Sequence, residues 1–286
     1  MIDCLVIGKG PAGISCAIYL KRFNINVVVI GKDNGTLQNS SLIENYYGID
    51  SIDGNDLIEK GVNQAKKLGI EVIDDEVISI EKNDFFKITT KNYEFNSKCV
   101  FLACGKPRNK LKIAGIEEYD GKGISYCAIC DGFFYRKKRI GIIGAKEYMI
   151  SEYNILKRFS SDIVIFTNGE LLDLDAEIVY DPIGSFYGDT KLSGLKTTKN
   201  SYDLDACFIA NGSASGVSFA KHLGIILDEN DNIIVDKYQT NIGGLFAGGD
   251  IIGGVMQVVK AASDGACAAI EINKYLKKWK RTIWKI

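Results

Sequence analysis

The chain contains 286 residues, of which 46% are hydrophobic and 25% are charged, and its formal net charge at pH 7 is −1. This composition excludes a disordered or fibrous protein, and the length, greater than the roughly 100–200 residues of a typical domain, predicts two domains. The near-neutral charge predicts no general affinity for nucleic acid, and the lack of an apolar run of about 18 residues predicts no membrane-spanning helix.

The start of the chain and its cysteine content indicate a compartment. Met1-Ile2-Asp3 lacks the basic region of a signal peptide, so we expect a cytoplasmic protein. Eight cysteines in so long a chain do not predict a secreted disulfide scaffold. Six of them are interpreted as buried packing residues, namely Cys4, Cys16, Cys99, Cys104, Cys207 and Cys267.

The N-terminal segment predicts a dinucleotide-binding unit. Residues 3–8 predict a buried strand, and the glycine turn Gly8-Lys9-Gly10-Pro11-Ala12-Gly13 follows directly, before a helix over 14–22 and a second buried strand over 27–30. In this context a GxGxxG motif is strong evidence, because its glycines let the backbone approach a pyrophosphate at the helix N-terminus. A purely structural turn is the alternative. The acidic residue that usually follows the second strand is missing, since Gly31-Lys32-Asp33 stands there.

The next segments predict a helix and a meander of short strands. Residues 54–68 have helical periodicity. Residues 99–105 predict a buried strand that ends at a glycine. Between them, β-branched and aromatic content predicts strands over residues 70–73, 77–81, 85–90 and 93–95.

A pair of cysteines near the middle of the chain indicates redox chemistry. Cys127 and Cys130 are separated by two residues, a spacing that allows a small disulfide ring and two-electron exchange. Asp131 offers a carboxylate for proton exchange with a thiol, in a chain whose only histidine is His222. A zinc site needs four ligands, and no second pair of cysteines or histidines stands at usable spacing, so no metal is expected. A buried, inert pair is the remaining alternative.

The end of the chain predicts the second half of the dinucleotide site. Residues 243–250 predict an apolar strand that ends in Gly248-Gly249-Asp250, and a helix rich in small residues begins near Gln257. Asp250 is placed to accept hydrogen bonds from sugar hydroxyls, and the helix start supplies free amides. We therefore expect a discontinuous domain of residues 1–109 and 240–286, interrupted by an inserted domain of residues 110–239.

These motifs resemble those of the low-molecular-weight thioredoxin reductases, and the resemblance covers essentially the whole chain. It rests on Gly8–Gly13, Glu44–Gly48, Ala103–Gly105, Cys127–Tyr135 and Gly248–Asp250. It implies an α/β fold of two Rossmann-like, three-layer ββα dinucleotide-binding-type domains, the second inserted in the first. It also implies a homodimer that binds FAD and reduces thioredoxin after a rotation of the domains.

The resemblance assigns roles to individual residues. It implies that Cys127 attacks thioredoxin, that Cys130 contacts the flavin and that Asp131 is the acid/base carboxylate. The positions expected to contact FAD are Gly8, Gly10, Pro11, Ala12, Gly13, Gly31, Lys32, Gln38, Asn45, Val77, Ala103, Gly105, Gly249, Asp250, Gln257 and Val258.

The inserted domain departs from the family at the place where relatives hold NADPH. Residues 139–149 predict a strand and turn, but the turn reads Gly-Ala-Lys-Glu-Tyr-Met in place of GxGxxA. Lys146 stands where a glycine lets the pyrophosphate reach the backbone, and Met149 replaces a small residue needed for close packing. Glu147 adds a negative charge at the helix start. The segment 162–170 contains no arginine or histidine to pair with a 2′-phosphate.

This departure resembles the ferredoxin-dependent flavin thioredoxin reductases, which keep FAD and the cysteines but take electrons one at a time from reduced ferredoxin. The alternatives are an NADPH-dependent reductase with an atypical nucleotide site and a flavin-bound redox sensor without turnover. Trp279 and Trp284 are assigned to flavin shielding, a dimer contact or core packing. An acidic donor would need a basic surface, for which the candidates are Lys106, Arg108, Lys110, Lys112, residues 136–139, Lys274, Lys277, Lys278, Lys280, Arg281 and Lys285.

Overall fold

The computed structural model describes the backbone of residues 1–40, 42–105, 111–126, 128–211 and 216–283, and the side chains of these residues except 39, 129, 130, 216, 217 and 280–283. The chain forms two compact units, one of Met1–Arg108 with Ser215–Ile286 and one of Asn109–Ala214.

The return to the first unit comes earlier in the chain than the predicted boundary at residues 239 and 240. The polar residues 236–240 form a turn of the first unit, in which Asp236 and Gln239 exchange two backbone hydrogen bonds of 2.9 Å. The Ile233 amide donates to the Ile251 carbonyl at 2.9 Å, and helix α5 (Gly216–Leu223) packs against strand β4. Residues 215–239 therefore belong to the first unit, and the predicted inserted domain 110–239 is too long at its C-terminal end.

The first unit is built on a seven-stranded sheet in the order β3-β2-β1-β6-β5-β4, with β15 paired to β6. Strands β1, β2, β3 and β15 run parallel to their neighbours, whereas β4 and β5 are antiparallel to theirs. The strands are β1 (Ile2–Ile7), β2 (Val27–Ile30), β3 (Glu71–Ile73), β4 (Val77–Lys82), β5 (Phe86–Thr90), β6 (Glu94–Leu102) and β15 (Leu245–Ala247).

Strand β6 was predicted as two separate strands, over 93–95 and 99–105, and it is continuous. Polar residues at 96–98 interrupt the apolar pattern of the sequence. Ser97 is nonetheless buried, and its hydroxyl donates to the Cys99 carbonyl at 2.7 Å, while Lys98 pairs with Asp3 at 2.5 Å. Local pairing of these polar groups allows one strand to join the antiparallel and parallel parts of the sheet.

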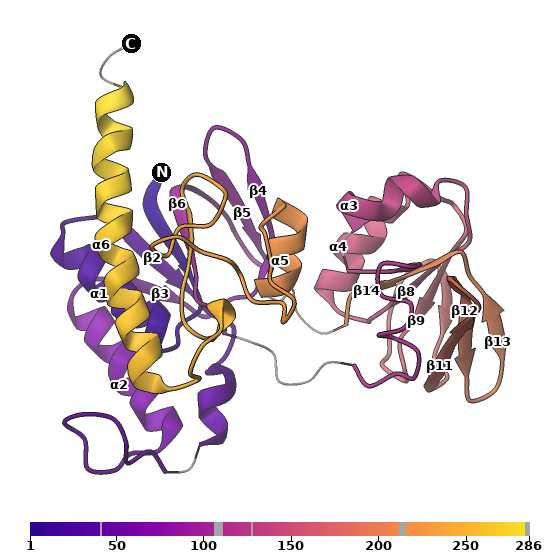
Figure 1. Ribbon diagram of the computed structural model, residues 1–286, viewed down its shortest axis with the longest axis horizontal. Coiled ribbons are helices and arrows are strands. Elements are labelled where there is room, and N and C mark those ends of the chain that lie inside the picture. Colours follow the sequence, from indigo (N-terminus) through magenta and orange to yellow (C-terminus); the bar gives the residue numbers. More distant parts are fainter. Residues whose placement is uncertain (41, 106–110, 127, 212–215, 284–286) are drawn as a thin grey trace. The chain divides into compact units, whose positions relative to one another are not determined.

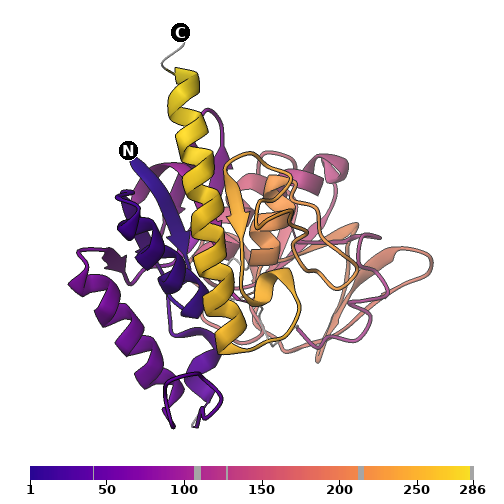
Figure 2. The same ribbon diagram turned by 60° about the vertical axis from the view of Figure 1, so that its left-hand side comes forward.

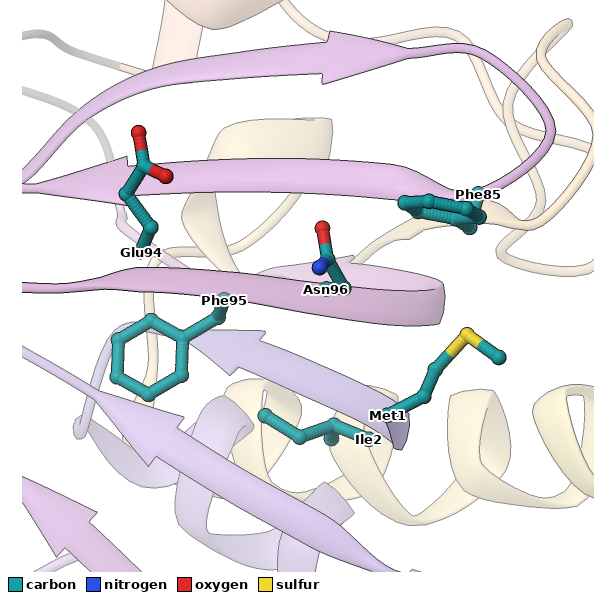
Figure 3. Close-up of a pocket in the computed structure, with 6 residues that line it drawn as sticks. All are labelled: Met1, Ile2, Phe85, Glu94, Phe95 and Asn96. Atoms are coloured by element: carbon teal, nitrogen blue, oxygen red, sulfur yellow. The ribbon is translucent and has the colours of Figure 1, made fainter.

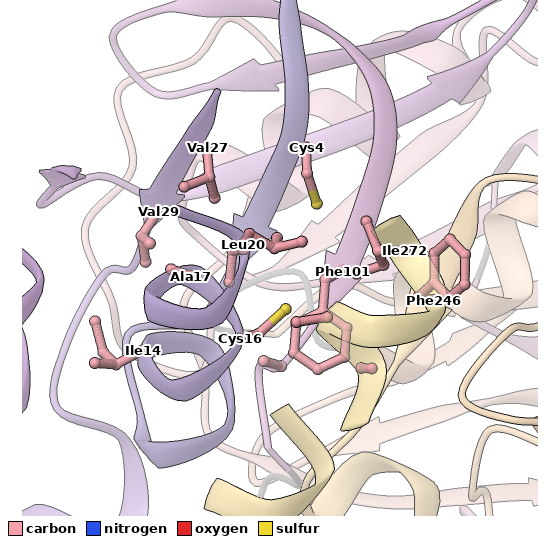
Figure 4. Close-up of a cluster of buried hydrophobic side chains, with 14 of the residues drawn as sticks. Cys4, Ile14, Cys16, Ala17, Leu20, Val27, Val29, Phe101, Phe246 and Ile272 are labelled. Carbon is pink, nitrogen blue, oxygen red and sulfur yellow. The ribbon is translucent and has the colours of Figure 1, made fainter. Parts of the chain in front are cut away.

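Helices cover the parallel part of this sheet. Helices α1 (Pro11–Arg22) and α6 (Val258–Ile283) lie side by side against it, and α2 (Gly54–Lys67) packs on α1 (Figures 1 and 2). Between them lies a core of small and branched apolar side chains, into which the thiols of Cys4 and Cys16 project (Figure 4). Short 3₁₀ helices η1 (Gly35–Asn39) and η3 (Asp250–Ile252) complete the unit. No helix in the described ranges is long and apolar enough to cross a bilayer.

The second unit repeats the same plan on a smaller scale. A five-stranded parallel sheet has the order β10-β9-β8-β14-β7. A three-stranded antiparallel sheet, β11-β12-β13, falls between β10 and β14 in the sequence. The sequence patterns did not predict this second sheet. The two parallel-sheet, nucleotide-binding-like domains confirm the predicted α/β fold. The elements are β7 (Ile124–Ser125), α3 (Ala128–Asp131), η2 (Gly132–Tyr135), β8 (Ile140–Ile143), α4 (Glu147–Leu156), β9 (Ile163–Phe166), β10 (Glu177–Val179), β11 (Ile183–Gly188), β12 (Leu192–Thr197), β13 (Ser201–Asp203) and β14 (Ala206–Ile209).

A pocket of about 400 Å³ lies at the start of β1, between it and the β5–β6 hairpin (Figure 3). Its lining residues are Met1, Ile2, Phe85, Glu94, Phe95 and Asn96. Because the glycine turn follows the other end of β1, this pocket is separate from the predicted dinucleotide site.

The contact between α1 and α6 requires a glycine. A methyl group at Gly265 would lie 2.0 Å from the Ala12 carbonyl oxygen, so Gly265→Ala should lower the free energy of unfolding by about 2–4 kcal/mol. Gly61→Ala is the matched control, because Gly61 also lies within a helix but its methyl group would meet only Ile14 Cγ2 at 3.4 Å. Urea unfolding of both variants measures the difference, and equal stability of the two would contradict the prediction.

Candidate functional site

The first glycine turn leaves open space at the N-terminus of α1. Gly8 has φ +114°, and a methyl group there would lie 2.2 Å from the Ala103 carbonyl oxygen. A methyl group at Gly13 would lie 1.8 Å from the Gly8 carbonyl oxygen. Both positions therefore require glycine for close backbone packing. Gly10 differs, because a methyl group there would meet no heavy atom within 4 Å.

This open space faces the amides of a helix start. Gly10 is the N-cap of α1, Pro11 occupies the first turn, and the first turn carries no acidic side chain. The first amides of a helix have no partner within the helix, and its N-terminus carries partial positive charge. The turn thus has the open space and the free amides that a pyrophosphate requires, and its role as the FAD site stays a prediction.

An ion pair with a buried carboxylate supports the second glycine motif. Asp264, which is 6% exposed, accepts a hydrogen bond from the Gly249 amide at 2.9 Å and pairs with Lys260 at 2.8 Å. The Lys260 ammonium also donates to the carbonyl oxygens of Gly249 and Gly253, at 2.9 and 2.7 Å. Sequence reasoning missed this pair, although a Lys and an Asp four residues apart in a small-residue helix were a usable signal.

Several of the predicted FAD-contacting residues lie together. Besides the contact between Gly8 and Ala103, a methyl group at Gly249 would lie 3.1 Å from Ala12 Cβ. The side-chain amide of Asn45 donates a hydrogen bond to Gln257 Oε1 at 2.9 Å. This bond joins two residues that are predicted to contact FAD and are 212 positions apart in the sequence. Asp250 begins η3 directly after Gly249, and Val258 begins α6.

Other residues predicted to contact FAD form ion pairs or packing contacts with other parts of the first unit. Lys32 pairs with Glu76 at 3.4 Å. The Lys9 side chain covers Gly31 and pairs with Asp74. Of the rest, Gly105 has φ +65° beyond the end of β6, Val77 is buried at the start of β4, and exposed Gln38 lies in η1, where its carbonyl oxygen accepts from Asn55.

The second glycine turn has the same backbone plan, but side chains fill it. Gly144 has φ +148°, and a methyl group there would lie 2.3 Å from the Ala210 carbonyl oxygen, as Gly8 relates to Ala103. At the N-cap of α4 stands Lys146, with φ −114° and ψ 179°, close to the extended φ −76° and ψ −175° of Gly10. Its side chain pairs with Glu170 at 3.7 Å.

The helix start at this second turn is also less suited to an anion. Met149 is fully buried, and its Cβ would lie 2.9 Å from a methyl group at Gly144. Glu147 places an acidic side chain in the first turn of α4. After β9, where a cationic side chain would pair with a 2′-phosphate, the neutral Asn168 instead accepts a hydrogen bond from the Ile183 amide at the start of β11, at 2.9 Å.

The redox pair is described only in part. Cys127 lies outside the described residues, and Cys130 lies in α3, where only its backbone is described. Asp131 Oδ2 accepts a hydrogen bond from the Ser125 hydroxyl at 2.7 Å, which fixes the predicted acid/base carboxylate at the end of α3.

Helix α4 contributes two further side chains around this segment. Glu152 is 3% exposed, and its Oε2 accepts a hydrogen bond from the Ala128 amide at 2.7 Å. The Tyr148 hydroxyl donates to the Tyr126 carbonyl oxygen at 3.2 Å. Burial raises the pKa of Glu152 to about 7, against the opposing effect of the Ala128 amide. Sequence reasoning missed Glu152, and the available signal was an acidic residue on the apolar face of a helix.

The remaining cysteines are free, and four of the six are buried. Cys104 and Cys267 are half-buried rather than fully buried as predicted. Partial burial nonetheless raises the pKa of the Cys104 thiol to about 12, which disfavours its thiolate at neutral pH.

The basic clusters are partly neutralised. Arg139 pairs with Asp162 and Glu177 at 2.6 and 3.0 Å, and Lys138 pairs with Asp205 at 3.4 Å. Lys98 lies over the Trp279 ring at 5.0 Å, so this tryptophan packs against the first unit. The candidates Lys106, Arg108, Lys110, Trp284 and Lys285 lie outside the described residues, as do the side chains of Lys280 and Arg281.

Known proteins share both the sequence pattern and the fold. The sequence model of the pyridine nucleotide-disulphide oxidoreductase family matches residues 2–146 and 182–265. The unmatched segment between these ranges contains α4, which follows the filled second turn, and strands β9 and β10. The thioredoxin reductase of Ureaplasma parvum is 32% identical, over 96% of this chain and 97% of the relative.

Solved structures of thioredoxin reductases share the fold of this chain. The atypical thioredoxin reductase TRi of Desulfovibrio vulgaris Hildenborough has a TM-score of 0.90 and 33% identity, over 97% of this chain and 99% of that one. A ferredoxin-flavin thioredoxin reductase of Clostridium acetobutylicum has a TM-score of 0.72 and 29% identity, over 97% and 98% of the two chains. The chain therefore belongs to the pyridine nucleotide-disulphide oxidoreductases and, among them, to the low-molecular-weight thioredoxin reductases, a family of FAD-binding enzymes.

Proposed function

We propose that the chain passes electrons from reduced ferredoxin, through FAD, to the Cys127/Cys130 disulfide and on to thioredoxin. The observation that carries the choice of donor is the filled second turn, where Lys146 and Met149 replace the glycines of the first. The likeness to the ferredoxin-flavin reductase of Clostridium acetobutylicum supports the same donor. We also expect a homodimer, and a cytoplasmic location, which the free thiols favour.

The first unit supplies the cofactor site in this proposal. The turn from Gly8 to Gly13 would hold the pyrophosphate of FAD at the amides of α1. Asp250 would accept hydrogen bonds from sugar hydroxyls, and Asn45 and Gln257, whose side chains are hydrogen-bonded to each other, would contact the same cofactor. Bound FAD supplies the conversion between one-electron and two-electron transfer.

The cysteine pair carries the reducing equivalents outward. The Cys127/Cys130 disulfide takes two electrons and two protons and becomes two thiols. Cys127, as a thiolate, then attacks one sulfur of the thioredoxin disulfide and forms a mixed disulfide, and Cys130 attacks Cys127 to release reduced thioredoxin. Asp131, held by Ser125, is the group that accepts and returns the thiol proton.

Reduced ferredoxin should bleach the flavin absorbance of the purified protein within the turnover time, whereas NADPH and NADH should not. The physical reason is that Lys146 and Met149 leave no glycine-lined turn for a pyrophosphate. Anaerobic stopped-flow mixing measures this directly.

The controls separate the alternatives. Fast bleaching by either nicotinamide would overturn the ferredoxin assignment in favour of an NADPH-dependent or NADH-dependent reductase. If Cys127→Ser left thioredoxin reduction intact, the cysteine pair would not be the outlet, and failure of every donor to support turnover would favour a redox sensor.

Gly10→Val should reduce FAD occupancy by roughly tenfold or more, because its side chain would fill the space next to the amides of α1. It should leave the urea midpoint of the FAD-free protein unchanged, since a methyl group there meets no heavy atom within 4 Å. Gly243→Val is the matched control, because a methyl group at Gly243 also meets nothing within 4 Å. The flavin-to-protein absorbance ratio measures occupancy, and wild-type occupancy in Gly10→Val would exclude this turn as the FAD site.

A further inference from the structure

Helix α4 contacts the chain immediately before and immediately after Cys127. Tyr148 donates to the carbonyl oxygen of Tyr126 at 3.2 Å, and Glu152, one helical turn later, accepts from the amide of Ala128 at 2.7 Å. These two atoms belong to the peptide groups on either side of Cys127. Both side chains that hold them are buried, with exposures of 6% and 3%.

We propose that Glu152 is a positioning residue for disulfide exchange, which holds the start of the cysteine helix and tunes the reactivity of the Cys127/Cys130 pair through its charge. The inference rests on the proposed function of that pair. It adds a second carboxyl group to the region, on a different element from Asp131 and bonded to the opposite end of α3.

The surroundings of Glu152 leave its charge unscreened. Among the described residues, no basic side chain forms an ion pair with it. On α4 and on the neighbouring α3 and η2, the other titratable residues with described side chains are Asp131, Tyr135, Glu147, Tyr148 and Tyr153. None of these is a cation, so ionised Glu152 is a buried negative charge stabilised by one amide.

Because Glu152 is bonded to the amide of the residue that follows Cys127, its negative charge should oppose formation of a thiolate at the cysteine pair. Below about pH 7 Glu152 is largely protonated and has little effect. Above that pH its charge disfavours a cysteine thiolate, which makes the reduced pair less stable and the dithiol a stronger reductant. Formation of a thiolate in turn favours protonation of Glu152, so each negative charge raises the pKa of the other group.

The test is the reduction equilibrium of the cysteine pair in the full-length, FAD-loaded protein. Wild type, Glu152→Gln and Glu177→Gln are equilibrated with reduced and oxidised dithiothreitol at pH 6.0 and pH 8.5. The Cys127 and Cys130 thiols are then trapped with a maleimide and counted by mass spectrometry. Gln keeps an oxygen that can accept from the Ala128 amide, and Glu177→Gln removes the same charge from an exposed side chain that pairs with Arg139.

At pH 8.5 Glu152→Gln should shift the equilibrium toward the dithiol by about three- to tenfold, where tenfold corresponds to about 30 mV, because a like charge changes a nearby thiol pKa by about one unit. At pH 6.0 its equilibrium should match that of wild type. A shift that is equal at both pH values, or no larger than that of Glu177→Gln, would overturn the proposal.

Two further readouts keep the outcome decisive. If Glu152→Gln does not fold, the wild-type protein alone decides, since its equilibrium plotted against pH must change slope near pH 7, and a straight plot refutes the role. If no disulfide between Cys127 and Cys130 forms in any protein, the proposed function fails as well. If the disulfide forms normally but its reduction equilibrium is the same with and without the Glu152 charge, only the role of Glu152 is refuted.

Discussion

The close approach of backbone segments around the first glycine turn is the constraint on which the flavin unit depends. Gly8 lies against the end of β6, Gly13 lies against Gly8, and Gly265 lies against the start of α1, at distances that admit no side chain. These contacts fix the end of β1, the start of α1 and the first turns of α6 in one place. The open space at Gly10 is then a consequence of the surrounding packing, because the neighbouring segments cannot move inward to fill it.

Buried strands and helices whose apolar residues follow a regular spacing were predictable from the sequence. Elements that depend on contacts with residues far away in the sequence were not. The glycine turn, α1 and β2 follow from an apolar run, a glycine motif and a second apolar run. The continuity of β6 was hidden, because polar residues interrupt its apolar pattern and one of them, Lys98, pairs with Asp3, which lies 95 positions earlier in the chain. Residues 215–239 were assigned to the wrong unit, since their contacts with β4 and Ile251 are made across the sequence.

The same division holds for the functional residues. Motifs identified the glycine turns. Residue size alone predicted that the first turn is open at Gly10 and that a side chain occupies the equivalent position, Lys146, in the second turn. Residues that act by supporting others were missed. Asp264 is buried beneath Gly249 and Glu152 beneath Ala128, and each is an acidic side chain whose role depends on one backbone amide from elsewhere in the chain. A single sequence gives no sign of which amide that is.

Helix α4 links the two departures of this chain from a nucleotide-binding domain. Its N-cap is Lys146 and its first turn carries buried Met149, where a nucleotide would need glycine and a small residue. A helix packed this closely on its sheet excludes water from its inner face, and that exclusion is what raises the pKa of Glu152. Closing the turn to a soluble hydride carrier and burying a carboxyl group against the cysteine helix are therefore two results of the same packing. The same helix therefore carries both the residues that fill the second turn and the side chains that hold the backbone on either side of Cys127.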